Sequence, residues 1–366
     1  MEDLELIASF WRGKRVLVTG HSGFKGSWLT LWLNALGAKV TGISLPPVTT
    51  PNLFTEVNIS ALCDSRFCDI RDRVPFIDQI HAITPQIVFH LAAQPLVRPG
   101  YEEPLWTFET NVMGTLHLLE ALRDVEAVRV AVMITTDKVY RENARPHRED
   151  DVLGGKDPYS ASKAACEHVI ACYRDSFLAV NGVAVASARA GNVIGGGDWS
   201  RDRLIPDAVR AWQEGQTLEV RRPQSVRPWQ HVLEPLWGYL TLARKLWQRP
   251  TLAGAYNFGP EETDTATAGD VIELARMAYG RGEVRYGDGK SGPHESAWLA
   301  LDKSKAQALL GVSPEMALVQ AVERTMAWYR AHGQGVKARD LCLADIADYQ
   351  RLVQGASVVA PLASSA

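Results

Sequence analysis

Short, uninterrupted apolar runs alternate with helical patterns through the first half of this chain, and this alternation restricts its fold more than any other feature. Five runs have the length and character of buried strands: residues 15–19, 39–44, 86–91, 130–135 and 183–187. Helical spacing of apolar residues fills three intervals: 24–36, 107–122 and 159–172. Strands without a polar face belong in a parallel sheet that helices cover on both sides. Because the crossovers are right-handed, we expect an α/β fold with a doubly wound parallel Rossmann sheet.

After about Gly191 the alternation gives way to segments rich in Gly, Pro, Arg and Trp, with interspersed helices. At roughly 150 residues per domain, a chain of this length has room for a second core. We expect an NAD-binding Rossmann domain at 11–190 and a smaller mixed α/β lobe at 191–350. That lobe would bind substrate over the strand ends, with some elements interleaved. Residues 351–366 are expected to form a flexible tail.

Composition excludes several classes of protein. Of the 366 residues, 46% are hydrophobic and 22% charged, which is the balance of a globular protein. The net charge of −3 gives no basic field for nucleic acid or an anionic membrane. The sequence shows neither a signal peptide nor an apolar run of the ~18 residues that span a bilayer, so we expect a cytoplasmic location. The five cysteines include no C-x-x-C pair, and we expect no metal site.

A glycine-rich loop directly follows the first predicted strand and opens the first predicted helix. Its G-x-x-G-x-x-G spacing lets the backbone approach a pyrophosphate, and the helix N-terminus supplies unpaired N–H groups. A plain tight turn is the alternative for the glycines alone, but the strand before and the helix after favour a dinucleotide site. The expected contacts are Gly20, His21, Gly23, Phe24, Lys25 and Gly26.

The second predicted strand ends Gly-Ile-Ser-Leu-Pro, without the acid that usually binds the ribose 2′-hydroxyl and without an arginine for a 2′-phosphate. The residues therefore leave NAD and NADP open. Asp69 and Ile70 are candidates to flank the adenine, with a surface aspartate as the competing interpretation.

Tyr159 and Lys163 stand one turn apart in a predicted helix that Asp157 caps and Pro158 begins. A free tyrosine, with a pKa near ~10, is a poor base at neutral pH. A nearby ammonium and an oxidised nicotinamide ring would favour the phenolate, which can take a proton from a sugar hydroxyl. Y-x-x-x-K alone is commonly a surface pair, but the glycine loop upstream favours a catalytic one.

Polar residues end the strand predicted at 130–135, at the sheet edge where catalytic groups of this architecture gather. Thr136 can hydrogen-bond the sugar hydroxyl, and Asp137 can act as an acid toward a leaving group. The alternative interpretation is an Asx turn that closes the strand.

Six segments together resemble the extended branch of the short-chain dehydrogenase/reductase superfamily and, within it, the CDP-glucose 4,6-dehydratases. They are GHSGFKGSW at 20–28, HLAAQPLVR at 90–98, TNVMGT at 110–115, RAGNVIGGGDW at 189–199, RLIPD at 203–207 and RPWQHVLEP at 227–235. The likeness runs from about residue 11 to residue 349. It implies NAD as cofactor, with further contacts from Leu91, Ala92, Ala93 and Gln94. It also implies substrate contacts from Arg98, Asn192, Arg203 and Arg227, where solvated surface arginines are the alternative.

The resemblance also implies a reaction and an assembly. Tyr159 would remove the C4 hydroxyl proton while hydride passes to NAD, water would leave C6 with Asp137 as acid, and the hydride would return to C6. Other nucleotide-sugar dehydratases carry Glu after that Asp, whereas this chain has Lys138. We hypothesise that Lys138 is the C5 base, with electrostatic stabilisation of the enolate as the rival role. Family members pair the helices at 107–122 and 159–172 between subunits, so we expect a homodimer.

One segment departs from the subgroup, and two other functions remain as alternatives. Residues 141–151 lack the aromatic residues typical of the CDP-glucose enzymes, which puts substrate fit or lid closure in doubt. A 4-epimerase or reductase would share the glycine loop, Tyr159 and Lys163, but needs no acid for C6. A sensor that has lost catalysis would be expected to lack the Tyr or the Lys.

Overall fold

The computed structural model describes residues 4–289 and 298–356. Its central sheet is parallel throughout, with strand order β11-β6-β5-β4-β1-β2-β3. The strands are β1 Arg15–Thr19, β2 Lys39–Ser44, β3 Asp64–Phe67, β4 Ile87–His90, β5 Val130–Ile134, β6 Ala184–Ala190 and β11 Gly254–Phe258. The order reverses between β1 and β4, which creates the crevice where ligands of such sheets bind. The predicted doubly wound fold is confirmed.

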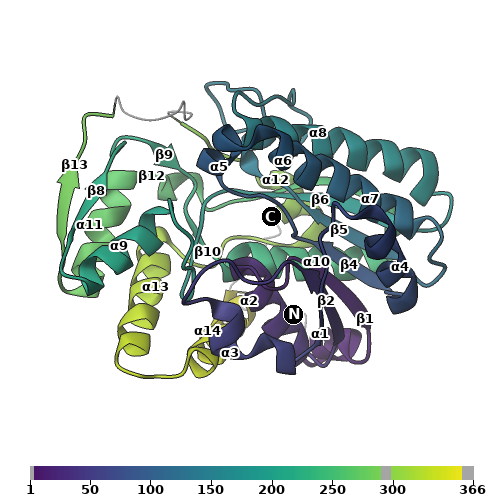
Figure 1. Ribbon diagram of the computed structural model, residues 1–366, viewed down its shortest axis with the longest axis horizontal. Coiled ribbons are helices and arrows are strands. Elements are labelled where there is room, and N and C mark those ends of the chain that lie inside the picture. The colour runs from purple at the N-terminus through teal and green to yellow at the C-terminus, as the bar shows by residue number, and fades with distance from the viewer. Residues whose placement is uncertain (1–3, 290–297, 357–366) are drawn as a thin grey trace, which may run out of the picture.

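Helices cover both faces of this sheet (Figure 1). On one face lie α4 Arg73–Ile83, α7 Gly114–Leu122 and α8 Pro158–Tyr173; on the other lie α2 Phe24–Ala35 and α10 Leu233–Gln248. Successive strand residues point to opposite faces. Leu17 therefore packs in the core with Phe76 and Leu118, while Val16 and Val18 join the core of Trp28.

Differences from the predicted elements have local causes. The strands β1 and β2 have the predicted bounds, whereas β4, β5 and β6 differ from the predicted strands only at their ends. The strand β3 was not predicted because its sequence Asp-Ser-Arg-Phe is polar, as an edge strand paired on one side permits. The helix predicted at 107–122 consists of α6 Pro104–Phe108, a π-helical turn η2 Glu109–Met113, and α7.

A smaller lobe follows the sheet, built from paired short strands and helices (Figure 1). Its strands pair as β7 Val193–Ile194 with β10 Gln230–His231, β9 Val226–Arg227 with β12 Ala266–Thr267, and β8 Thr217–Val220 with β13 Glu283–Tyr286. Its helices include α9 Leu204–Gln213, α11 Ala268–Tyr279 and α13 Leu318–Gly333. Both β11 and α10 come from beyond residue 190 yet belong to the sheet layers.

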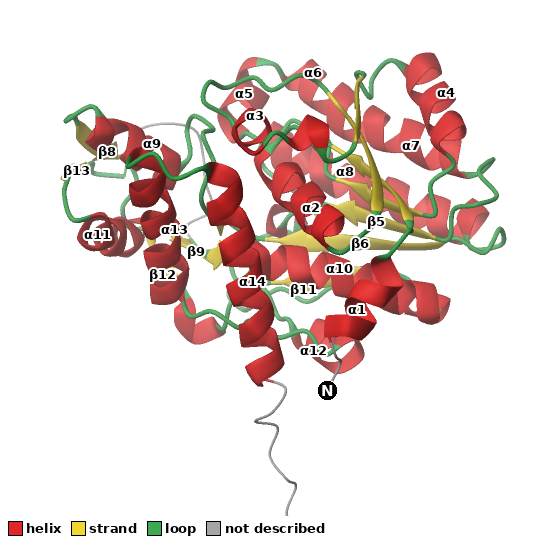
Figure 2. Cartoon of the chain, turned by 90° about the horizontal axis from the view of Figure 1, so that it is seen from below, coloured by secondary structure: helices red, strands yellow, loops and turns green. Residues whose placement is uncertain are grey.

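The remaining helices frame these layers. They are α1 Leu4–Trp11, α3 Leu53–Val57, α5 Val97–Glu102, α12 Ser304–Leu310 and α14 Ala338–Ala356. The helix α14 lies beside α13 and reaches α2 and α3 (Figure 2). It continues into the predicted tail as far as Ala356, and residues 357–366 lie outside the described residues. Within residues 4–289 and 298–356, no helix has the length and apolar character needed to cross a membrane.

Candidate active site

A cavity of about 1190 Å³ opens at the carboxyl ends of the parallel strands, between the sheet and the smaller lobe. This is the position that a doubly wound sheet reserves for ligands. Among the predicted site residues, those lining the cavity are Gly20, Gly23, Phe24, Lys25, Gly26, Asp69, Ile70, Leu91, Ala92, Ala93, Gln94, Arg98, Thr136, Lys138, Tyr159, Lys163, Asn192, Arg203 and Arg227. The two exceptions are His21 and Asp137.

The glycine loop requires glycine for two different reasons. Gly20 has φ +78°, a conformation that side chains rarely adopt, and a Cβ there would lie 2.7 Å from the backbone nitrogen of Ala92. A Cβ on Gly26 would lie 2.0 Å from the carbonyl oxygen of Gly20. Helix α2 therefore starts pressed against the loop, which leaves its N-terminus open to the cavity.

The imidazole of His21 does not line the cavity. It is buried against β2 and β3. Its Nδ1 is 3.0 Å from Ser44 Oγ and its Nε2 is 2.7 Å from Ser65 Oγ. Burial lowers the pKa of His21 to about 4, so the ring is neutral at pH 7. The ring occupies the space beside Gly42, where a Cβ would lie 2.2 Å away. The His21 side chain thus ties the glycine loop to β2 and β3.

Lys25 lines the cavity, and its side chain reaches α10, which covers the same face of the sheet as α2. Its Nζ donates to the Tyr239 hydroxyl at 2.9 Å. Burial lowers the pKa of Lys25 to about 7, and the charges of Arg203 and Lys163 act in the same direction. The sequence carries no signal for this contact, because Tyr239 lies 214 residues away in an apolar stretch of α10.

Two residues of the predicted cofactor set have their side chains engaged within the protein. Gln94 Nε2 donates to the carbonyl of Leu96 and to Thr107 Oγ1, both at 2.9 Å, so it fixes the loop after β4. Asp69 pairs with Arg71 at 2.6 Å. Both residues still contribute to the cavity wall.

Tyr159 and Lys163 lie on α8, which begins where Asp157 accepts a hydrogen bond from the Ser160 backbone N–H at 3.0 Å. Lys163 Nζ donates to the carbonyl of Ile134 at 3.1 Å. Burial raises the pKa of Tyr159 to about 12, against the lowering effects of a Thr136 hydrogen bond and of Arg203. In the protein alone the phenol is therefore neutral at pH 7.

Asp137 lies one layer behind Thr136 and Lys138, which form the wall in front of it. Its Oδ1 accepts hydrogen bonds from Thr136 Oγ1 at 2.9 Å and Lys138 Nζ at 3.0 Å. Its buried Oδ2 has no hydrogen-bond partner among the described residues and faces Gly191, where a Cβ would lie 2.9 Å away. Lys138 Nζ also donates to Asn192 Oδ1 at 3.2 Å. The Oδ2 atom of Asp137 can therefore accept a further hydrogen bond.

Arginines gather where the smaller lobe meets the cavity. Arg98 pairs with Asp202 at 2.9 Å, and Arg203 pairs with Asp198 at 2.8 Å. Three more guanidinium groups reach the wall, those of Arg221, Arg222 and Arg227. The sequence reasoning missed the first two of these, although the basic pair after β8 was their signal. Forked arginine donors suit the oxygens of a diphosphate.

Comparison with known proteins agrees with this arrangement. The family model described as GDP-mannose 4,6 dehydratase matches residues 17–325. A CDP-glucose 4,6-dehydratase of Salmonella typhimurium is 45% identical over 349 residues, which cover 93% of this chain and 97% of that protein. A UDP-glucose 4-epimerase of Mycoplasma pneumoniae is 25% identical, covering 86% of this chain and 96% of that protein.

Solved structures share the fold. The structure of MoeE5 in complex with UDP-glucose and NAD has a TM-score of 0.74 at 25% identity, covering 87% of this chain and 99% of that chain. A dTDP-glucose 4,6-dehydratase of Bacillus anthracis in complex with NAD has a TM-score of 0.71 at 21% identity, covering 87% and 97%, which supports the fold alone. Because one family model spans most of the sequence and the Salmonella enzyme is 45% identical along nearly all of it, the chain belongs to the GDP-mannose 4,6 dehydratase family of NAD-dependent nucleotide-sugar dehydratases.

Proposed function

We propose that this enzyme is a lyase that converts CDP-glucose to CDP-4-keto-6-deoxyglucose by internal hydride transfer and loss of water across C5 and C6. The observation that carries the proposal is that Tyr159 from α8 and Thr136 from the end of β5 line one cavity beside the glycine loop, with Asp137 hydrogen-bonded directly behind Thr136. The cytidine nucleotide and the glucose are inferred from the 45% identity to the Salmonella enzyme.

The residues present fit NAD. The backbone packed around Gly20 and Gly26 leaves no room for a Cβ at either position, and the open N-terminus of α2 suits a pyrophosphate. No arginine follows β2 directly, where a 2′-phosphate would need one, so NAD is the proposed cofactor. When bound, its nicotinamide ring supplies the hydride acceptor for C4 and the donor for C6, together with a positive charge beside Tyr159.

The chain's own residues then divide the proton transfers. Tyr159 takes the proton of the C4 hydroxyl, and the Thr136 hydroxyl orients it. The 4-ketone acidifies C5, where Lys138 is either the base or the cation that stabilises the enolate. Asp137 donates to the C6 hydroxyl as it leaves. Support for this role is its second carboxylate oxygen, which has no hydrogen-bond partner among the described residues. Lys163, held by the Ile134 carbonyl, fixes the floor of the nicotinamide site.

The smaller lobe is proposed to hold the nucleotide diphosphate near Asn192, Arg203 and Arg227, with Arg98 as a further substrate contact. When the substrate binds, one of its phosphate oxygens would replace the Asp202 carboxylate as the charge-assisted hydrogen-bond partner of Arg98. A cytoplasmic location remains a prediction.

The experiment that tests this function is a turnover comparison of CDP-, dTDP-, GDP- and UDP-glucose with the purified enzyme. A 4-keto-6-deoxy product absorbs in alkali, and we expect it from CDP-glucose with the highest kcat/KM. Product from dTDP-glucose at a higher kcat/KM would replace the proposed nucleotide. Formation of a 4-epimer without any keto product would favour the epimerase alternative.

We further propose that the enzyme is a homodimer. The surface over α6, η2 and α7 exposes Leu105 and Met113, with Leu116 half-buried beside them, whereas Leu119 and Ala164 are buried inside the chain. Helix faces of this kind pack against a second copy in four-helix dimer interfaces. Light scattering at micromolar concentration is expected to give twice the 40.3 kDa chain mass. Leu105→Glu should shift the mass toward the monomer, and a wild-type monomer would contradict the proposal.

A further inference from the structure

A buried ion pair lies behind the cavity and is not part of its wall. Glu167 on α8 and Arg189 on β6 are each 4% exposed, and Arg189 donates to the carboxylate through Nε at 2.9 Å and Nη2 at 2.7 Å. The hydroxyls of Thr135 and Ser187 donate to the same carboxylate, one to each oxygen. Both charges are thus compensated, as a buried pair requires.

This pair touches each segment that holds a proposed reacting group. Thr135 directly precedes Thr136 and Asp137 at the end of β5. Glu167 follows Lys163 by one turn of α8 and Tyr159 by two turns, so all three share one helix face. Arg189 stands shortly before Gly191 and Asn192, which face Asp137 and Lys138 respectively.

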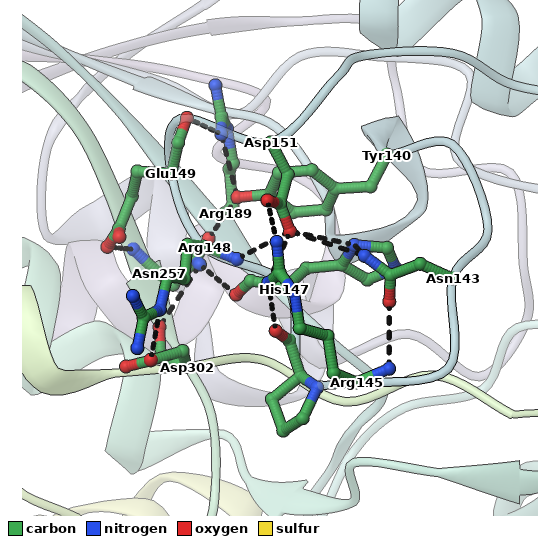
Figure 3. Close-up of polar contacts among 11 residues, drawn as sticks. Tyr140, Asn143, Arg145, His147, Arg148, Glu149, Asp151, Arg189, Asn257 and Asp302 are labelled. Atoms are coloured by element: carbon green, nitrogen blue, oxygen red, sulfur yellow. Dashed lines mark hydrogen bonds and ion pairs between the residues drawn. The ribbon is translucent and has the colours of Figure 1, made fainter.

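The free end of the guanidinium reaches the segment that follows Asp137 (Figure 3). Arg189 Nη1 donates to the Tyr140 hydroxyl at 2.7 Å and to the Glu149 carbonyl at 3.0 Å. The Tyr140 hydroxyl in turn donates to Asn257 Oδ1 at 2.6 Å, on β11. The short helix η3 Asp137–Val139 is therefore held at both ends by one arginine–glutamate unit.

Asn257, which accepts from the Tyr140 hydroxyl, anchors the segment at 141–151 (Figure 3). Asn257 donates from Nδ2 to the His147 carbonyl at 2.9 Å and from its backbone nitrogen to Glu149 Oε1 at 2.9 Å. The His147 ring stacks on the Tyr140 ring with centroids 4.6 Å apart. The segment that lacks the expected aromatic residues is thus fixed to the core by polar contacts.

We propose that Glu167 and Arg189 are positioning residues that set the place of the Thr136–Asp137–Lys138 segment relative to Tyr159. The inference rests on the proposed dehydratase chemistry, in which Tyr159 acts at C4 and Asp137 at C6 of one hexose. Two proton transfers on one sugar ring require both groups within a fraction of an ångström of their working positions. A rigid, fully hydrogen-bonded pair between the two elements meets that requirement.

The test compares two hydroxyls on the same carboxylate. Thr135→Val removes the hydrogen bond on the side of Asp137 and keeps the shape of the side chain. Ser187→Ala removes the corresponding hydrogen bond on the other oxygen, inside β6 and away from the reacting groups. We expect both to lower the thermal midpoint similarly. Only Thr135→Val should lower kcat, by about tenfold, with KM unchanged.

Thr135→Ser is the rescue variant, because it restores the donor without the methyl group, and it should return kcat to near the wild-type value. Equal kcat in Thr135→Val and Ser187→Ala would overturn the inference. So would a loss in Thr135→Ser equal to that in Thr135→Val, since the cavity wall rather than the hydrogen bond would then be responsible. The comparison uses whichever nucleotide hexose the wild type converts, so failure of CDP-glucose as substrate is seen separately in the wild type.

Discussion

Tyr159, the proposed base for the C4 hydroxyl, lies in surroundings that oppose its ionisation. Burial raises its pKa to about 12, and the Thr136 hydroxyl is its hydrogen-bond partner. Tyr159→Phe keeps the ring and removes the group that takes the C4 proton. We expect product formation to slow by a factor on the order of 100 or more, with NAD binding and thermal midpoint close to wild type. A wild-type rate for this variant would remove Tyr159 from the mechanism.

Asp137→Asn separates the two halves of the reaction. The amide oxygen can still accept from Thr136 and Lys138, so the change is confined to the second, unpartnered oxygen. Oxidation at C4 should proceed, but the C6 hydroxyl loses its acid. We expect the absorbance of reduced nicotinamide to build up with bound 4-ketohexose, and product to fall by roughly 100-fold. Product at the wild-type rate would make the epimerase the leading alternative.

At the residue scale, the sequence predicted the residues that line the cavity better than the buried contacts that His21 and Lys25 make with other elements. Tyr159 and Lys163 follow from helical spacing, and Arg203 from resemblance. The buried position of the His21 ring depends on the space that Gly42 leaves in β2. The Lys25–Tyr239 contact depends on where α10 packs on the sheet. Contacts between distant segments leave no local pattern, so neither was predictable from the residues alone.

At the element scale, the glycine loop and α2 depend on one close approach. Gly26→Ala would place a Cβ 2.0 Å from the Gly20 carbonyl oxygen, so the start of α2 must move. We expect NAD binding, measured by calorimetry, to weaken at least tenfold and the thermal midpoint to fall. Gly333→Ala, at the end of α13 with nothing within 4 Å, is the matched control and should be neutral or stabilising by about 0.5–1 kcal/mol. Equal NAD affinity in both variants would contradict the close approach.

The elements that the sequence predicted are those whose periodicity is local. Apolar strands buried on both faces, such as β1 and β5, are recognisable without any tertiary information. The polar edge strand β3 and the late strand β11 are not, because each takes its strand character from the neighbour that it pairs with. The π-helical turn η2 interrupts a helical pattern where Asn111 bonds both to the Gln94 backbone and to Ser162. Such a bulge is set by the partners and not by the helix itself.

At the scale of the whole molecule, buried histidines set how stability depends on pH. Burial lowers the pKa of His21 to about 4 and the pKa of His90 and His231 to about 3. Between these values and the ordinary 6.5, the unfolded chain binds more protons than the folded chain, so stability falls as the pH falls from about 6.5 toward 4. Burial raises the pKa of Glu234 to about 7. Between pH 4.5 and 7 the folded chain therefore binds more protons at this carboxyl than the unfolded chain does, so the contribution of Glu234 stabilises the fold as the pH falls.

Burial also raises the pKa of Asp345 to about 6, so two acids oppose the three histidines. Because the histidines outnumber these acids, we expect the thermal midpoint to fall as the pH is lowered from 6.5 to 4.5. Each group contributes at most about 1.4 kcal/mol per pH unit to the slope of the unfolding free energy. His231→Asn retains an acceptor for the Leu233 backbone N–H, which now bonds to Nδ1, but does not titrate. It should make the slope shallower, whereas Glu234→Gln should make it steeper because one opposing group is gone. Scanning calorimetry across this pH range measures both, and a wild-type midpoint that rises on acidification would show that Glu234 and Asp345 together outweigh the buried histidines.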